Sequence, residues 1–135
     1  MKAADTSVVV AALAGWHEGH AAAWAALAAG RVRLPAHCLV EAYSVLTRLP
    51  PPHRFDPGVA RNLLRSSFPS PPLTLDAADY AFLLDRLVEA RVDGGGTYDA
   101  LIGVTAARHD AILLTRDQRA VRVYAALDVR FELIA

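Results

Sequence analysis

The sequence has few features that would cross-link the chain or anchor it in a membrane. Cys38 is the only cysteine, so no disulfide bond can form within the chain, and a single thiol in a predicted helix is most often a small core residue. The apolar stretch from 21 to 29 falls far below the roughly 20 residues that a membrane span needs. We therefore expect a protein of a reducing, cytoplasmic compartment with no membrane contact.

The sequence also lacks an excess of either charge and has almost no lysine. The 14 basic and 14 acidic residues give a formal net charge of zero, and Lys2 is the only lysine. A balanced charge gives no evidence of bulk attraction to nucleic acid and none against a local basic groove. Arginine suits bidentate phosphate contacts, but the codons of a GC-rich genome would produce the same bias. The 54% of hydrophobic residues excludes a disordered chain.

Hydrophobic periodicity and turn residues predict strands that alternate with helices. We expect strands at 2–5, 31–34, 73–75, 111–115 and 129–133. We expect helices at 6–14, 17–29, 35–49, 57–68, 77–91 and 119–127, and one that begins at 97. In the helix at 77–91, the residues expected to face inward are Phe82, Leu83 and Leu87. The alternation favours an α/β domain of βαβ units around a mostly parallel sheet.

The stretch from 94 to 120 is expected to place one aspartate at the start of a helix and another just after a buried strand. Thr97 follows three glycines and can cap a helix. Asp99 then falls in the first turn, where the helix dipole favours negative charge. The apolar face of this helix consists of Tyr98, Leu101, Ile102, Thr105 and Ala106. The run from 111 to 115 reads as a strand covered on both sides, and Asp117 follows its carboxyl end.

Four of the acidic residues lie where one edge of the sheet would gather them: Asp5, Glu41, Asp99 and Asp117. Right-handed crossovers place the carboxyl ends of parallel strands at the same edge, where ligands of open α/β sheets bind. Carboxylates a few Å apart repel and raise one another's pKa. A hard divalent cation such as Mg²⁺ removes that repulsion and can activate water against a phosphodiester. The set therefore indicates a metal-dependent phosphodiester hydrolase.

Each residue of this set also has a structural explanation. Asp5 can be a helix cap, Asp99 a partner of the helix dipole, and Asp117 a turn residue. Glu41 is harder to explain in this way, because a carboxylate beside an apolar helix face needs a partner. Gly103, one turn after Asp99, either clears space for a substrate or allows close helix packing.

In combination, these motifs resemble the PIN-domain ribonucleases of the VapC type, which are toxins of bacterial toxin–antitoxin pairs. The matching segments are Asp5-Thr6-Ser7, Glu41 in the third helix, Tyr98-Asp99-Ala100-Leu101-Ile102, and Leu114-Thr115-Arg116-Asp117 followed by Arg119-Ala120. The resemblance covers nearly the whole chain. One departure is the first strand, where Ala3 and Ala4 replace the usual bulky aliphatic residues.

The resemblance implies a three-layer α/β/α sandwich with a central mostly parallel sheet, as one PIN domain over residues 1–135. It also implies an endoribonuclease that depends on Mg²⁺, with Mn²⁺ as an alternative, and that leaves 5′-phosphate and 3′-hydroxyl ends. The implied partners are an RNA substrate, a second copy of the chain in a homodimer, and a cognate antitoxin that blocks the site.

The family's metal-binding acids match Asp5, Glu41, Asp99 and Asp117. The first, third and fourth would hold the ion directly or through water, while Glu41 would orient or deprotonate the attacking water. The hydroxyls of Thr115 and Ser7 match groups near the metal. The arginines that we expect to contact RNA are Arg48, Arg116 and Arg119.

Two competing hypotheses are also compatible with the sequence. One is a catalytically silent PIN-like module that binds RNA or a partner protein. The other is a different phosphate enzyme on a related fold, such as a phosphatase or phosphoreceiver domain. That second class needs a lysine beside an aspartyl nucleophile, and Lys2 stands at the wrong end of its strand.

Overall fold

Four short parallel strands form the centre of the computed structural model, which describes all of residues 1–135. They are β1 (Lys2–Ala4), β2 (Val32–Arg33), β3 (Ile112–Thr115) and β4 (Phe131–Leu133). Their order in the sheet is β2-β1-β3-β4, and every neighbouring pair runs parallel. The mostly parallel sheet predicted from the sequence is confirmed, and the carboxyl ends of β1 and β3 lie side by side.

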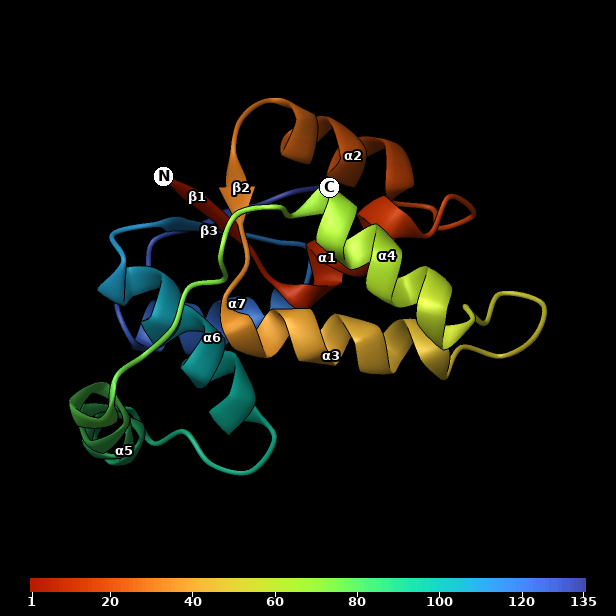
Figure 1. Cartoon of the computed structure of the whole chain (residues 1–135). Coiled ribbons are helices and arrows are strands. Elements are labelled where there is room, and N and C mark those ends of the chain that lie inside the picture. Colours follow the sequence, from red (N-terminus) through yellow and green to blue (C-terminus); the bar gives the residue numbers. More distant parts are fainter.

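Seven helices cover the two faces of this sheet. They are α1 (Thr6–Leu13), α2 (His20–Ala28), α3 (Ala36–Thr47), α4 (Pro57–Ser67), α5 (Ala77–Ala90), α6 (Gly96–Arg108) and α7 (Gln118–Ala126). Figure 1 shows α1, α2 and α4 on one side of the sheet and α5, α6 and α7 on the other. Helix α3 contributes to both cores, through Cys38 to one and Ala42 to the other. The predicted three-layer α/β/α sandwich is therefore confirmed.

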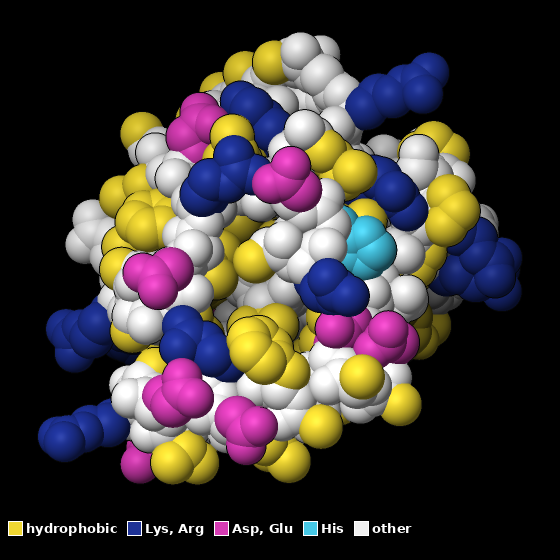
Figure 2. Space-filling view, turned by 90° about the vertical axis from the view of Figure 1, so that its left-hand side faces the viewer, with side chains coloured by type: hydrophobic (Ala, Val, Ile, Leu, Met, Phe, Trp, Pro, Cys, Tyr) yellow, Lys and Arg dark blue, Asp and Glu magenta, His cyan; other side chains and the backbone are white.

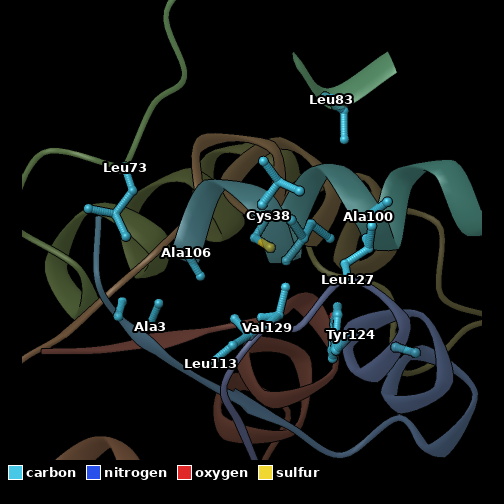
Figure 3. Packing of buried hydrophobic residues seen from close by; sticks show 14 of the residues in the cluster. Ala3, Cys38, Leu73, Leu83, Ala100, Ala106, Leu113, Tyr124, Leu127 and Val129 are labelled. Carbon is cyan, nitrogen blue, oxygen red and sulfur yellow. The ribbon is translucent and has the colours of Figure 1, made fainter. Parts of the chain in front are cut away.

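Strand β3 shows why two hydrophobic cores form. Successive residues of a strand point to opposite faces of the sheet. Leu113 accordingly packs in a core with side chains of α5, α6 and α7, while Leu114 packs in a core with α1, α2 and α4. Figure 3 shows the first of these cores, with Leu113 near Val129 and Tyr124. Because both faces of β3 are covered, packing fixes the position of the strand end from which the next loop begins.

Gly103 serves close helix packing. A Cβ atom at this position would lie 3.0 Å from Tyr124 Cδ1 and 3.1 Å from Val129 Cγ2. Those distances are closer than ordinary carbon contacts, so glycine lets α6 approach α7 and the chain that follows it. Of the two explanations considered for Gly103, the structure supports packing rather than space for a substrate.

Two predicted elements differ in the structure. The expected strand at 73–75 reduces to one bridge between Leu73 and Pro35, because the partner segment turns into α3 at Ala36 and offers no further strand to pair with. The helix expected at 17–29 begins at His20, because hydrogen-bonded turns occupy the preceding residues.

Two side-chain predictions on the outer helices were also wrong. Thr97 does not cap α6, because the helix already begins at Gly96, where Gly94 with a φ of 55° leads the chain into it. Phe82 is 55% exposed, whereas Leu83 and Leu87 are buried as expected. Helix α5 lies at the periphery in Figure 1 and buries only a narrow stripe, so Phe82 faces away from the core.

The surface and the single thiol agree with the sequence. On the face drawn in Figure 2, acidic and basic side chains are interspersed, as a balanced net charge would produce. Cys38 is fully buried, and burial raises the pKa of its thiol, as expected of an unreactive core residue. None of the seven helices combines the length and hydropathy that crossing a bilayer requires.

Candidate metal centre

The carboxyl edge of the two central strands brings Asp5 and Asp117 together from opposite ends of the sequence. Asp5 directly follows β1, and its backbone amide donates a hydrogen bond to Leu114 O of β3 at 3.0 Å. Asp117 lies two residues beyond the last residue of β3. The two aspartates are therefore placed by the same pair of neighbouring strands, as the parallel topology predicts.

Asp5 is buried, at 3% exposure, and serves as the N-cap of α1. Its Oδ1 accepts hydrogen bonds from the amides of Ser7 and Val8 and from the Ser7 hydroxyl. Its Oδ2 accepts a hydrogen bond from the hydroxyl of Tyr124 at 2.9 Å. Burial raises the pKa of Asp5, and these hydrogen bonds counteract the rise. The capping role thus occupies Oδ1, and Oδ2 takes no part in the cap.

Asp117 combines a capping role with an available oxygen in the same way. It is the N-cap of α7, and its Oδ1 accepts hydrogen bonds from Arg119 N at 2.9 Å and Ala120 N at 3.3 Å. Both of these bonds go to Oδ1. A structural role for this residue therefore does not exclude a role in binding a ligand.

The two supporting hydroxyls connect the loops that carry these aspartates. The buried Thr115 Oγ1 accepts a hydrogen bond from Asp117 N at 3.1 Å. Ser7 Oγ donates to Asp5 and accepts from Arg116 N at 2.8 Å. Thr115 and Ser7 therefore hold the two loops in register, which gives each of them a positioning role next to the carboxylates.

Asp99 is the carboxylate whose charge is least compensated. It lies in the first turn of α6 and is half-buried. Burial and the charges of Asp117, Asp5 and Glu41 raise its pKa from 3.8 to about 6, and only His37 acts in the opposite direction. No hydrogen bond contributes to this balance. Asp5, Glu41 and Asp117 therefore all lie close enough to Asp99 to raise its pKa.

Glu41 has the partner that its position beside an apolar helix face requires. Its Oε2 lies 3.2 Å from His37 Nε2, one turn earlier on α3. The His37 ring in turn stacks on Tyr98, with ring centroids 5.5 Å apart and an interplanar angle of 9°. His37 therefore links Glu41 to the helix that carries Asp99.

Sequence reasoning missed two residues of this site. The spacing of four between His37 and Glu41 is the signal that could have identified His37, because such residues lie on one helix face. Nothing in the sequence pairs Tyr124 with Asp5, because 119 positions separate them and only the tertiary fold brings them into contact.

A cleft of about 660 Å³ is lined by two of the four carboxylates, Glu41 and Asp117, but not by Asp5 or Asp99. Its polar lining consists of Thr6, Ser7, His17, Glu41, Arg116, Asp117, Gln118 and Arg119. It therefore has acidic groups and basic groups in one concave surface. Two of the three arginines expected to contact RNA line this cleft. Arg48 does not, and it donates a hydrogen bond to Ser44 on the exposed face of α3 instead.

The donor set fits a hard divalent cation, although the side chains do not form a closed cage. No group of three or more His, Cys, Asp or Glu side chains is arranged closely enough to hold a metal ion as it stands. Four carboxylates nevertheless share one region, and Asp99 has no donor from the chain to balance its charge. Mg²⁺ prefers oxygen ligands and keeps several of its waters, so water can complete its contacts to such a set.

The raised pKa of Asp99 predicts how cation binding and stability depend on pH. Its contribution to the stability of the metal-free protein is fully present below about pH 4 and is lost as the pH rises through about 6, because the neutral form is favoured in the folded state. A cation needs the ionised form. We expect Mn²⁺ affinity, measured by calorimetry, to rise between about pH 5 and 7 and then to level off; an affinity independent of pH over this range would contradict the assignment.

Comparison with known proteins relates the whole chain to one family. The family model described as PIN domain matches residues 3–126. Ribonuclease VapC40 of Mycobacterium tuberculosis is 55% identical over 134 residues, which cover 99% of each chain. Ribonuclease VapC27 of the same species is 42% identical over 127 residues, which cover 94% of this chain and 92% of that protein.

Solved structures share the fold at low sequence identity. FitAcB from Neisseria gonorrhoeae superposes with a TM-score of 0.71 at 22% identity, over 97% of this chain and 96% of that one. VapBC2 from Rickettsia felis, bound to a DNA fragment from its promoter, gives a TM-score of 0.67 at 15% identity, over 98% and 97% of the two chains. At these identities the likeness concerns the fold alone.

Proposed function

The chain belongs to the PIN-domain family, next to the VapC ribonucleases, and on this premise we propose that it is a metal-dependent endoribonuclease and the toxin of a VapBC-type toxin–antitoxin pair. The observation that carries this proposal is the uncompensated carboxylate of Asp99, whose pKa is raised by Asp117, Asp5 and Glu41. We take residues 1–135 as one PIN domain.

The acids divide into two roles. Asp5, Asp99 and Asp117 hold a Mg²⁺ or Mn²⁺ ion directly or through water, with Oδ2 of Asp5 and of Asp117 as the oxygens left outside their caps. Glu41 orients the attacking water or accepts its proton, and His37 holds the Glu41 carboxylate through a contact of 3.2 Å. The bound ion supplies an activated water and neutralises charge on the phosphate.

The basic side of the cleft suits the RNA backbone. Arg116, Arg119 and His17 line the same concave surface as Glu41 and Asp117. Arginine binds phosphate through its planar guanidinium. His17 Nδ1 accepts a hydrogen bond from Gly19 N, which leaves Nε2 as the protonated, donating nitrogen. These groups would hold the phosphates that flank the cleaved bond.

The proposed partners follow from the same family relationship. A cognate antitoxin would inhibit the enzyme by covering this cleft. A homodimer would bury apolar side chains that are exposed on the single chain: Val40, Tyr43, Phe82, Leu84 and Val88. We further propose that the protein acts in the cytoplasm, where an RNA substrate is found and where a single buried cysteine stays reduced.

One of the two competing hypotheses fits the site less well. A phosphoreceiver or phosphatase of related fold would need a lysine at the carboxylates, but Lys2 Nζ pairs with Glu132 at 3.2 Å, and Lys2 begins β1 at the opposite edge from Asp5. A silent binding module remains the alternative, because it would use the same cleft and cation without hydrolysis.

The test of this proposal is RNA cleavage with and without divalent metal. The purified chain should cut single-stranded RNA in Mg²⁺ or Mn²⁺, stop when a chelator removes the ion, and leave 5′-phosphate ends that ligation-based sequencing can capture. If the chain binds both Mn²⁺ and RNA but leaves the RNA intact, the ribonuclease proposal is wrong and the silent module is correct.

A further inference from the structure

Tyr124 is the largest fully buried side chain of the protein, and its hydroxyl contacts a carboxylate of the candidate metal centre. The residue lies near the end of α7 with no exposed surface. Its hydroxyl donates to Asp5 Oδ2 at 2.9 Å, and both residues are buried. A buried hydroxyl needs a partner, and the partner of the Tyr124 hydroxyl is an oxygen of Asp5, one of the proposed metal ligands.

The position of the Tyr124 ring is fixed from several sides. Gly103 of α6 lies against one edge, where any added Cβ would come within 3.0 Å of the ring. Val129 packs nearby, as Figure 3 shows, and the ring of Phe131 lies 6.3 Å away between centroids. A phenol held by backbone and core side chains cannot easily move, so its hydroxyl presents a hydrogen-bond donor at a constant place.

The Asp5 carboxylate depends on Tyr124 for the orientation of one oxygen. Its Oδ1 is engaged by the Ser7 and Val8 amides and the Ser7 hydroxyl as the cap of α1. Its Oδ2 accepts from the Tyr124 hydroxyl at 2.9 Å, and the Thr115 hydroxyl is a further side-chain hydrogen-bond partner of the same carboxylate. A carboxylate oxygen can accept at two lone pairs, so the Tyr124 hydrogen bond does not prevent Oδ2 from binding a cation.

We propose that Tyr124 is a positioning residue that orients Oδ2 of Asp5 toward the divalent cation of the candidate site, and that Gly103 is required because it lets the Tyr124 ring reach this carboxylate. The inference rests on the proposed function, since it takes Asp5 as a ligand of that cation. It assigns to α6 a second contribution to the site, in addition to Asp99.

The phenol is suited to this role because it is a donor at neutral pH. A tyrosine hydroxyl has an ordinary pKa of about 10, and in the structure Tyr124 donates its proton to Asp5 Oδ2. Its partner is therefore a carboxylate with one oxygen hydrogen-bonded, in the way that outer hydrogen bonds fix the ligands of metal sites.

The test compares Tyr124→Phe with Tyr80→Phe in the full chain by Mn²⁺ calorimetry, far below the unfolding temperature. Tyr124→Phe keeps the buried ring and removes only the hydroxyl, and we expect a loss of Mn²⁺ affinity of about 10- to 100-fold. Tyr80 is exposed, so its variant should bind like the unaltered chain. Gly103→Ala, which keeps the hydroxyl but displaces the ring, should weaken Mn²⁺ binding in the same direction.

The outcomes separate this inference from the proposed function. Mn²⁺ affinity within twofold of the unaltered chain in Tyr124→Phe would overturn the positioning role, even if RNA cleavage is confirmed. If Tyr124→Phe does not fold, an unchanged affinity in folded Gly103→Ala would overturn it. If Tyr124→Phe weakens Mn²⁺ binding but the unaltered chain does not cleave RNA, the positioning role of Tyr124 is supported and the ribonuclease proposal is contradicted. Absence of Mn²⁺ binding by the unaltered chain would overturn both.

Discussion

Replacing Asp99 by asparagine should reduce metal-dependent RNA cleavage by more than about 100-fold. Removing a residue that only orients a metal ligand costs up to about 100-fold, and the loss of a ligand itself should cost more. Asp99 is the carboxylate with no hydrogen bond from the chain to offset its charge, and three other acids act on it. An amide keeps the shape of the side chain but not the negative charge that the cation requires. The measurement is the initial rate of RNA cleavage in Mn²⁺ with the variant at equal concentration.

The same variant should stabilise the metal-free protein. Asp99 is disfavoured in its ionised form by burial and by Asp117, Asp5 and Glu41, so a neutral side chain relieves repulsion at neutral pH. If the unfolding midpoint of the metal-free variant rises while RNA cleavage is lost, the loss of cleavage is a functional defect and not the result of a damaged fold. Asp85→Asn, on the exposed face of α5, is the matched control and should change neither quantity. Undiminished cleavage in both Asp99→Asn and Asp5→Asn would refute the site.

Leu113→Ala should lower the free energy of unfolding by about 2 to 5 kcal/mol, the range measured for large-to-small changes in well-packed cores. Leu113 is fully buried in the central strand and packs against α6 and α7. Because a domain of this size is stable by only about 5 to 15 kcal/mol, the loss is a large share of the total. The loop after β3 carries Asp117, so cation binding should be lost over the same denaturant range as the fold.

The control for this prediction is an exposed leucine. Leu84 of α5 is 65% exposed, and its replacement by alanine should change the free energy of unfolding by no more than about 0.5 kcal/mol. Urea unfolding followed by circular dichroism measures both variants. Equal, small effects of Leu113→Ala and Leu84→Ala would mean that β3 is not the buried centre of the sheet.

The features that could be predicted from the sequence are those set by local patterns. A short apolar run followed at once by a polar segment indicated β3 and placed Asp117 beyond its end. The alternation of strands and helices then implied parallel pairing, which puts Asp5 at the same edge. These steps need only periodicity, turn residues and handedness, and the sheet, the layers and the neighbouring strand ends followed from them.

The features that could not be predicted depend on contacts between distant segments. The hydroxyl of Tyr124 reaches Asp5 only because α7 packs under α6 at Gly103. Whether Phe82 faces the core depends on how far α5 lies from the sheet, which helical periodicity does not specify. Local patterns thus located the acids but not the groups that orient them.

The structure also adds physical detail to the predicted carboxylates. Capping explanations and ligand roles were alternatives for Asp5 and Asp117 when only the sequence was considered. In the structure each caps its helix through Oδ1, and this leaves Oδ2 to take another partner. The two roles are compatible because a carboxylate has two oxygens, and the cap fixes the side chain that a cation would need.

The central claim is that acids from four separate segments surround one divalent cation at the carboxyl edge of the sheet. Crystals of the full chain grown with Mn²⁺ and measured at the manganese absorption edge test it directly. The account predicts one strong anomalous peak next to Asp5, Asp99 and Asp117, with Glu41 close by. A Mn²⁺ peak elsewhere on the molecule, with none among these four carboxylates, would contradict it.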